Sequence, residues 1–181
     1  ASLLGLAGAA SAQDAGDQAT SVDDIIVTAQ KREQSLQEVP IVVTTLSEAL
    51  LEGAGVQDIK DLQILTPGLT VTSTQSEAST TVRIRGAGTV GDNPGLESSV
   101  GVVIDGVYRS RNSVGFGDLG ELSRIEVLKG PQGTLFGKNT SAGVINIITE
   151  QPSFEPGFEA ELTGGNYGAI GGSASVTGPL T

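Results

Sequence analysis

Short aliphatic stretches bounded by glycine-containing turns constrain this chain most strongly. The clearest are Val100–Ile104, Arg124–Leu128 and Val144–Thr149, each with a glycine within two residues of one end. Because the chain has 26 glycines and only 3% aromatic residues, its core has to come from valine, isoleucine and leucine on short strands. The nearly continuous apolar run at Val100–Ile104 predicts a strand that is buried on both faces.

The remaining patterns predict an α+β domain with a small mixed β-sheet and short helices. Further strands are expected at Val39–Leu46, Leu69–Thr72 and Thr81–Arg85, the last with Val82 and Ile84 facing the core. One short helix is expected from Ser47 to Leu51. A second is expected where Val56, Ile59, Leu62 and Leu65 recur every three residues. Helices and strands mix without a regular βαβ order, which favours the α+β class.

The two ends of the chain differ from its middle. Residues 1–12 are apolar and end in Ala-x-Ala, which is typical of a signal-peptide remnant, and residues 13–38 form a polar, acidic and flexible lead. The compact domain is expected at residues 39–150. Residues 151–181 alternate apolar and polar positions between turns, as barrel strands do. No run of 18 apolar residues occurs, so an exported chain of this kind is expected to be soluble or a β-barrel.

Composition argues against nucleic-acid binding and against an enzyme. The net charge of -11 repels phosphate backbones, and the absence of cysteine and histidine removes thiol catalysis, histidine triads and the usual zinc ligands. The glycine-rich stretch Gly130–Asn139 fails as a phosphate loop, since Gln132 stands where a glycine is required and Asn139 replaces the magnesium-binding hydroxyl. No catalytic residue, metal site or cofactor is expected.

The stretch Leu122–Gly137, continued by Gly143–Thr149, closely resembles the plug domain of TonB-dependent outer-membrane receptors. Val82–Gly86, Val103–Tyr108 and Leu62–Leu69 resemble the same family and follow its order, so the resemblance covers residues 24–150. It implies a plug inside a β-barrel of about 22 strands in a Gram-negative outer membrane. Residues 151–181 would then be the first one or two strands of a truncated transmembrane barrel.

The resemblance also implies a TonB box in the periplasmic lead. The residues that match its pattern are Asp24, Ile25, Ile26, Val27, Thr28 and Ala29. They are β-prone and are expected to have free backbone donors, as pairing with a strand of TonB requires. TonB, energised by its inner-membrane complex, would pull on this segment to open the plug. The favoured substrate is an iron–siderophore complex, while cobalamin, haem, nickel complexes and oligosaccharides use the same architecture.

Alternating strand directions predict which loops meet the substrate. They place Ser73–Thr80 and Tyr108–Gly117 at the outer end and Gly86–Ser99 at the periplasmic end. The expected substrate contacts are Ser73, Thr74, Gln75, Ser76, Tyr108, Arg109, Arg111 and Asn112.

Basic residues of the plug are expected to meet the barrel wall. Arg85 matches a family arginine that meets barrel carboxylates, and Arg124 and Lys129 are expected to make similar contacts. The alternative function is a secreted plug-like binding or adhesion module without a barrel. A TonB box distinguishes the two, because an adhesin has no use for one.

Overall fold

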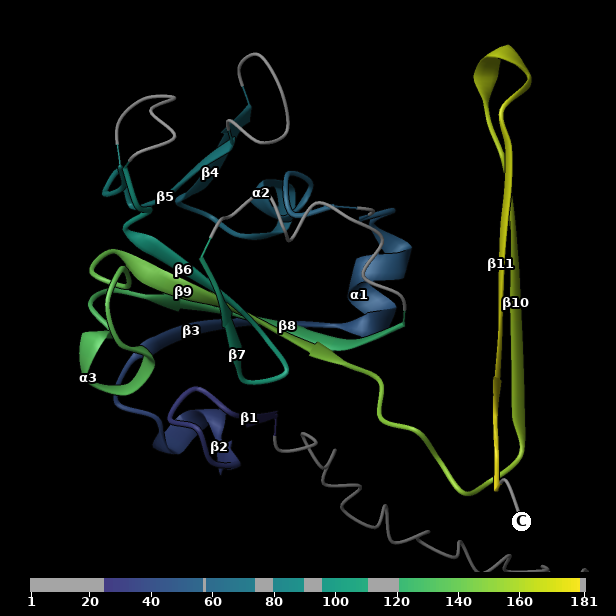
Figure 1. The fold of residues 1–181 in the computed structure, drawn as a ribbon, viewed down its shortest axis with the longest axis horizontal. Coiled ribbons are helices and arrows are strands. Elements are labelled where there is room, and N and C mark those ends of the chain that lie inside the picture. Colours follow the sequence, from purple (N-terminus) through teal and green to yellow (C-terminus); the bar gives the residue numbers. More distant parts are fainter. Residues whose placement is uncertain (1–24, 57, 74–79, 90–95, 111–120, 180–181) are drawn as a thin grey trace, which may run out of the picture.

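The computed structural model describes residues 25–56, 58–73, 80–89, 96–110 and 121–179. Its centre is a five-stranded sheet in the order β3-β8-β9-β6-β7 (Figure 1). These strands are β3 (Val42–Ser47), β6 (Val100–Ile104), β7 (Val107–Arg109), β8 (Leu122–Lys129) and β9 (Gly143–Thr149). β6 and β9 are parallel and the other neighbours are antiparallel. The mixed sheet expected from the sequence is confirmed, and β6 has the predicted bounds.

One face of the sheet carries the main hydrophobic core. It is covered by α1 (Glu48–Gly53), α2 (Leu62–Leu65) and the two-stranded sheet of β4 (Leu69–Ser73) and β5 (Thr80–Ile84). Val82 and Ile84 are buried there, as predicted.

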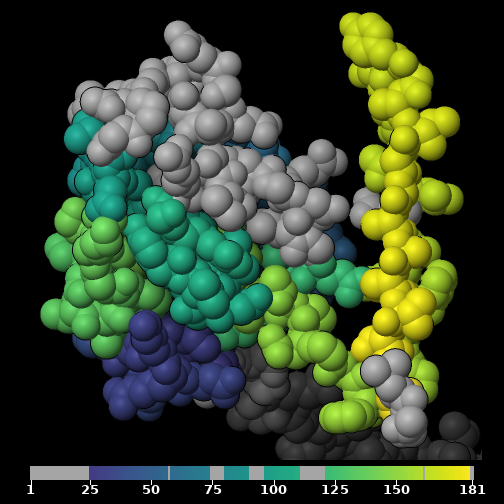
Figure 2. All heavy atoms as spheres, in the orientation of Figure 1, coloured from purple at the N-terminus to yellow at the C-terminus, as the bar shows by residue number. Residues whose placement is uncertain are grey.

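The other face of the sheet is covered by the N-terminal described residues. These form β1 (Ile26–Val27), β2 (Gln34–Ser35) and the 3-10 helix η1 (Leu36–Glu38). Val27 and Ala29 are fully buried against Val103, Leu128 and Val144. Figure 2 shows these residues, in purple, in direct contact with the body of the molecule.

This packing corrects the expectation that the lead is flexible with free backbone donors, because residues 25–38 belong to the folded unit. The physical reason is that strands with apolar residues on both faces need a cover on both.

Two local predictions were wrong in detail. The helix expected from Val56 to Leu65 is helical only at α2, because the Asp58 carboxylate accepts hydrogen bonds from the backbone N–H groups of Lys60 and Asp61 and stabilises a turn instead. The predicted apolar face still points inward at Ile59 and Leu62. The glycine-rich stretch Gly130–Asn139, for which no helix was predicted, contains a short helix, α3 (Gly133–Phe136).

The last described segment is an antiparallel hairpin that stands beside the five-stranded sheet and its covering elements in Figure 1. It consists of β10 (Gly157–Gly164) and β11 (Ile170–Thr177), joined through the 3-10 turn η4 (Asn166–Gly168). Phe158, Leu162 and Ile170 are between 73% and 90% exposed. None of the helices in the described part of the chain is both long and apolar enough to cross a membrane.

Candidate functional site

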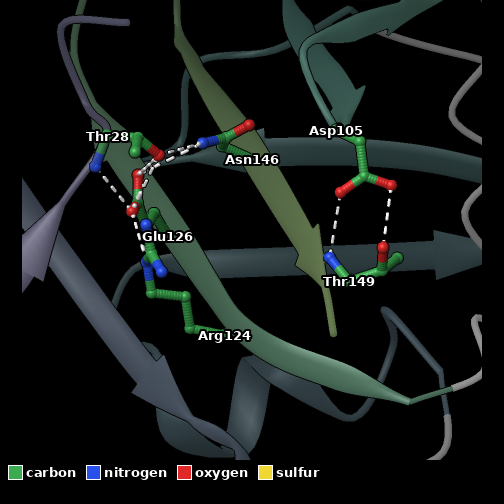
Figure 3. Close-up of polar contacts among 6 residues, drawn as sticks. All are labelled: Thr28, Asp105, Arg124, Glu126, Asn146 and Thr149. Carbon is green, nitrogen blue, oxygen red and sulfur yellow. Dashed lines mark hydrogen bonds and ion pairs between the residues drawn. The ribbon is translucent and has the colours of Figure 1, made fainter. Parts of the chain in front are cut away.

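A buried carboxylate lies where the N-terminal segment crosses the sheet (Figure 3). Glu126, in the middle of β8, is fully buried. Its Oε1 accepts hydrogen bonds from the backbone N–H of Thr28 at 2.8 Å and from Arg124 Nε at 2.9 Å. The Thr28 hydroxyl donates to both carboxylate oxygens at 3.1 and 3.2 Å, and Asn146 Nδ2 donates to Oε2 at 3.2 Å.

Strand pairing explains why these groups meet. Glu126 and Asn146 are directly opposite each other in the β8–β9 ladder, so their side chains leave the sheet on the same face. Arg124 precedes Glu126 by two residues and therefore shares that face. Asn146 Nδ2 also lies 3.2 Å from Thr28 Oγ1, which closes the cluster.

Pairing within the lead holds the same segment in place. Ile26 and Val27 pair with Ser35 and Gln34, and the Leu36 N–H donates to the Ile25 carbonyl at 2.8 Å. In the loop between β1 and β2, the Lys31 ammonium lies 5.5 Å from the centre of the Phe136 ring on α3, a cation–π contact. The structure therefore describes five of the six residues expected to form the TonB box, and Asp24 lies outside the described residues.

Two of the three predicted plug–barrel residues lie together at one end of the sheet. Burial lowers the pKa of the Lys129 ammonium, and the positive charge of nearby Arg85 lowers it further. Lys129 Nζ also donates to the Pro67 carbonyl at 2.9 Å. The third residue, Arg124, lies at the other end of β8, where its guanidinium pairs with Glu126. The structure thus places Arg124 apart from Arg85 and Lys129, although the sequence predicted the same role for all three.

The residues expected to touch substrate lie on different sheets. Ser73 is the last residue of β4, and its hydroxyl is 2.7 Å from that of its partner Thr80 on β5. Tyr108 and Arg109 lie on the edge strand β7, opposite Val103 and Val102. The other five predicted substrate contacts lie outside the described residues: Thr74, Gln75, Ser76, Arg111 and Asn112.

The structure places Tyr108 on a strand, whereas the sequence predicted it in a loop. Ile84, at the base of the β4–β5 hairpin, lies at the sheet end where β6 begins, close to Gly143, the partner of Val100. β6 runs away from that end to a turn at Asp105, and β7 returns beside it. Tyr108 is therefore part of the sheet edge rather than of an outer loop beyond β6.

An exposed polar cluster joins Tyr108 to the loop after α3. Glu97 accepts hydrogen bonds from Lys138 Nζ at 2.8 Å and from Asn139 Nδ2 at 2.7 Å, which lower the pKa of Glu97. The same hydrogen bond with Glu97 raises the pKa of Lys138. Asn139 Nδ2 also lies 3.2 Å from the Tyr108 hydroxyl oxygen. These contacts give Tyr108 a structural partner within the plug.

Sequence reasoning missed two polar contacts that Figure 3 displays. Glu126 and Asn146 were counted only as strand residues, although a charged and an amide side chain on otherwise apolar strands are a usable signal. Asp105 accepts hydrogen bonds from the backbone N–H and the hydroxyl of Thr149, both at 3.0 Å. Across the described ranges, no group of three or more acidic side chains is placed to hold a metal ion.

Comparison with known proteins places this geometry in a family. A family model described as TonB-dependent Receptor Plug Domain matches residues 35–144. The pesticin receptor of Yersinia pestis is 34% identical over 136 residues, which cover 73% of this chain and 19% of that protein. The vitamin B12 transporter BtuB of Vibrio vulnificus is 31% identical over 149 residues, covering 80% of this chain and 23% of that protein.

A solved structure agrees with these sequence relatives. The ferripyoverdine receptor of the outer membrane of Pseudomonas aeruginosa, bound to ferripyoverdine, has a TM-score of 0.71 at 25% identity. The match covers 86% of this chain and 20% of that one. The chain therefore spans about a fifth of the length of the relatives that it matches.

Proposed function

The chain belongs to the family of TonB-dependent receptor plug domains, and from this premise we propose that it gates an energy-coupled importer. Its relatives are named as receptors and a transporter, one of them a receptor of the outer membrane, which supports a non-enzymatic role for this chain in the outer membrane. The observation that carries the proposal is the match of residues 35–144 to the plug family. This range includes β3, β6, β7 and β8 completely and the first two residues of β9.

The proposed TonB-binding segment is Asp24–Ala29. Support comes from β1, a strand of this segment that is paired only with β2 among the described strands, and from the exposed side chains of Ile25 and Ile26. A segment that already adopts an extended strand is suited to pairing with a strand of TonB.

A pull-down with the C-terminal domain of TonB tests this assignment. The intact chain is expected to bind, and a variant lacking residues 24–29 is expected not to bind. Deleting Gln13–Asp17 from the same lead provides a matched control that should bind normally. Binding that survives the loss of residues 24–29 would refute the assignment.

The proposed substrate is an iron–siderophore complex. The ferripyoverdine receptor among the relatives supports this class, while the vitamin B12 transporter supports cobalamin as the competing substrate. Uptake by cells that express the whole receptor, with labelled ferric siderophores and labelled cobalamin offered side by side, distinguishes them. Accumulation of cobalamin alone would refute the iron–siderophore proposal.

The proposed substrate contacts are the outer loops of the plug. They are Ser73, Thr74, Gln75, Ser76, Tyr108, Arg109, Arg111 and Asn112. The exposed position of Ser73 at the end of β4 supports its role, whereas the contacts of Tyr108 support a role in packing.

The pair of Arg85 and Lys129 is the proposed contact with the barrel wall. Within the described ranges neither side chain forms an ion pair with a carboxylate. Burial lowers the pKa of Lys129, and the positive charge of Arg85 lowers it further. Carboxylates of a surrounding barrel would relieve that repulsion. Plug stability that is unchanged by Arg85→Ala inside the assembled receptor would count against this contact.

The β10–β11 hairpin is the proposed start of the barrel. Its register places Phe158 opposite Val176 and Leu162 opposite Gly172, whereas Thr163 and its partner Gly171 lie on the opposite face. An apolar face against lipid and a polar face against the lumen are typical of barrel strands.

Paired substitutions on its two faces test this assignment. Leu162→Arg is expected to impair assembly of the whole receptor, by up to about 2–4 kcal/mol if the position lies near the bilayer midplane. Thr163→Arg is the matched control and is expected to assemble normally. Equal assembly of both variants, measured by heat-modifiable gel mobility, would refute the assignment.

A further inference from the structure

The sheet face beneath the N-terminal segment contains a charged group among apolar neighbours. Glu126 is as fully buried as Leu128 and Val144 on the same face. A buried carboxylate is costly unless hydrogen-bond donors surround it, and an aliphatic side chain at this position would fit the core without that requirement. The hydrogen-bond donors around Glu126 should therefore explain why a carboxylate stands at this buried position.

The contacts come largely from one residue of the lead. Thr28 donates twice, through its backbone N–H at 2.8 Å and through its hydroxyl at 3.1 and 3.2 Å (Figure 3). Arg124 and Asn146 supply the remaining donors from the sheet itself. Thr28 and Glu126 are 98 residues apart in the chain, so this contact joins the lead directly to the central strand of the plug.

We infer that Glu126 is the positioning residue of a latch that holds Ile25–Ala29 on the plug and competes with TonB for that segment. The inference rests on the proposed function, which names Asp24–Ala29 as the TonB-binding segment. In the latched state the Thr28 N–H is already bound, and Ile26 and Val27 pair with β2. Pairing with TonB through Thr28 requires the latch to open.

The polar contact between Thr28 and Glu126 lowers the free-energy cost of opening the latch. When Thr28 leaves, water can donate hydrogen bonds to the uncovered carboxylate, while Arg124 and Asn146 stay in place on the sheet. Opening also uncovers the apolar surface beneath Val27 and Ala29, so the polar contact offsets only part of the cost. The exposed side chains of Ile25 and Ile26, at 49% and 43%, give a partner a first contact before the latch opens.

Hydrogen exchange of the Thr28 amide measures the latch without TonB. In the whole receptor we expect Glu126→Ala to speed this exchange by at least about tenfold, the equivalent of ~1.4 kcal/mol. Thr28→Val removes only the hydroxyl donor and is expected to speed exchange by a smaller factor without disturbing the sheet. Exchange of the Ile145 amide in the β8–β9 ladder is measured in parallel, and an unchanged rate there shows that the plug remains folded.

Glu121→Ala is the matched control. Glu121 is an exposed glutamate just before β8, and its removal is expected to leave the exchange of Thr28 unchanged. Unchanged exchange in both Glu126→Ala and Thr28→Val would overturn the latch, whatever TonB does.

Affinity for the C-terminal domain of TonB then tests the competition. Because the latched population reduces the apparent affinity, Glu126→Ala and Asn146→Ala are expected to tighten binding by up to about the same tenfold factor. Faster exchange with a measurable but unchanged affinity would overturn the competition. Faster exchange with no TonB binding in any variant would support Glu126 as the residue that docks the segment and would refute the proposed TonB-binding segment instead.

Discussion

Replacing Gly143 with alanine tests the close packing at the start of β9. Gly143 has a φ of +155°, a backbone conformation that residues with a side chain rarely adopt. A Cβ built on it would lie 2.4 Å from the carbonyl oxygen of Leu128 and 2.6 Å from Ile84 Cδ1. The Ile84 side chain can move, but the Leu128 carbonyl belongs to the central β8–β9 ladder.

The expected loss of stability follows from two separate costs. An unfavourable backbone conformation costs about 1–3 kcal/mol, and forcing an extra methyl into a packed core costs a further 1–3 kcal/mol or so. The free energy of unfolding should therefore fall by about 2–6 kcal/mol, which is a large share of the roughly 5–15 kcal/mol typical of a folded domain.

Urea unfolding followed by far-ultraviolet circular dichroism measures this loss. With a denaturant slope of ~2 kcal/mol per molar, the midpoint of unfolding should fall by about 1–3 M. Gly53→Ala is the matched control, since Gly53 ends α1, has no positive φ, and has open space where a Cβ would stand. Its midpoint should stay the same or rise slightly. Equal midpoints for the two variants would refute the argument from close packing.

Three further predictions concern charged groups. Burial, followed by repulsion from neighbouring glutamates, raises the pKa of Glu48, so its charge destabilises the fold above that pKa and this penalty disappears as the pH falls through it. Thermal melts of Glu48→Gln should show higher stability at pH 7 and a smaller gain in acid or in high salt. Lys138→Ala should move the pKa of Glu97 back up towards its ordinary value, because it removes the hydrogen bond that lowers it most, and a side-chain NMR titration that shows no rise would refute this. Arg124→Ala should lower the free energy of unfolding by about 1–3 kcal/mol, since it removes a donor from the buried Glu126 carboxylate, and a urea midpoint equal to wild type would contradict that role.

The local pattern of the sequence determined the strands. Val100–Ile104 was predicted with the bounds that the structure has, because a run of β-branched and aliphatic residues before an Asp-Gly turn has few other conformations. Val82 and Ile84 were placed inward by alternation alone. The family resemblance was equally readable, since it lies in contiguous motifs such as Leu122–Gly137.

Local competition limited the helix prediction. The spacing from Val56 to Leu65 identified the buried residues correctly, but spacing does not report that the Asp58 carboxylate binds the backbone N–H groups of the next turn. Side-chain hydrogen bonds of this kind replace helical ones at little cost, so the apolar face persists while the helix shortens.

Only the tertiary structure decided where the lead lies and which residues Glu126 contacts. The sequence of residues 25–29 predicts an extended segment whether it is free or docked, because extended backbone is compatible with both. Docking depends on a cover for the second face of the sheet and on a carboxylate 98 residues away. The order of the strands brings Glu126 and Asn146 side by side beneath Thr28, and such contacts between distant residues leave no trace in local periodicity.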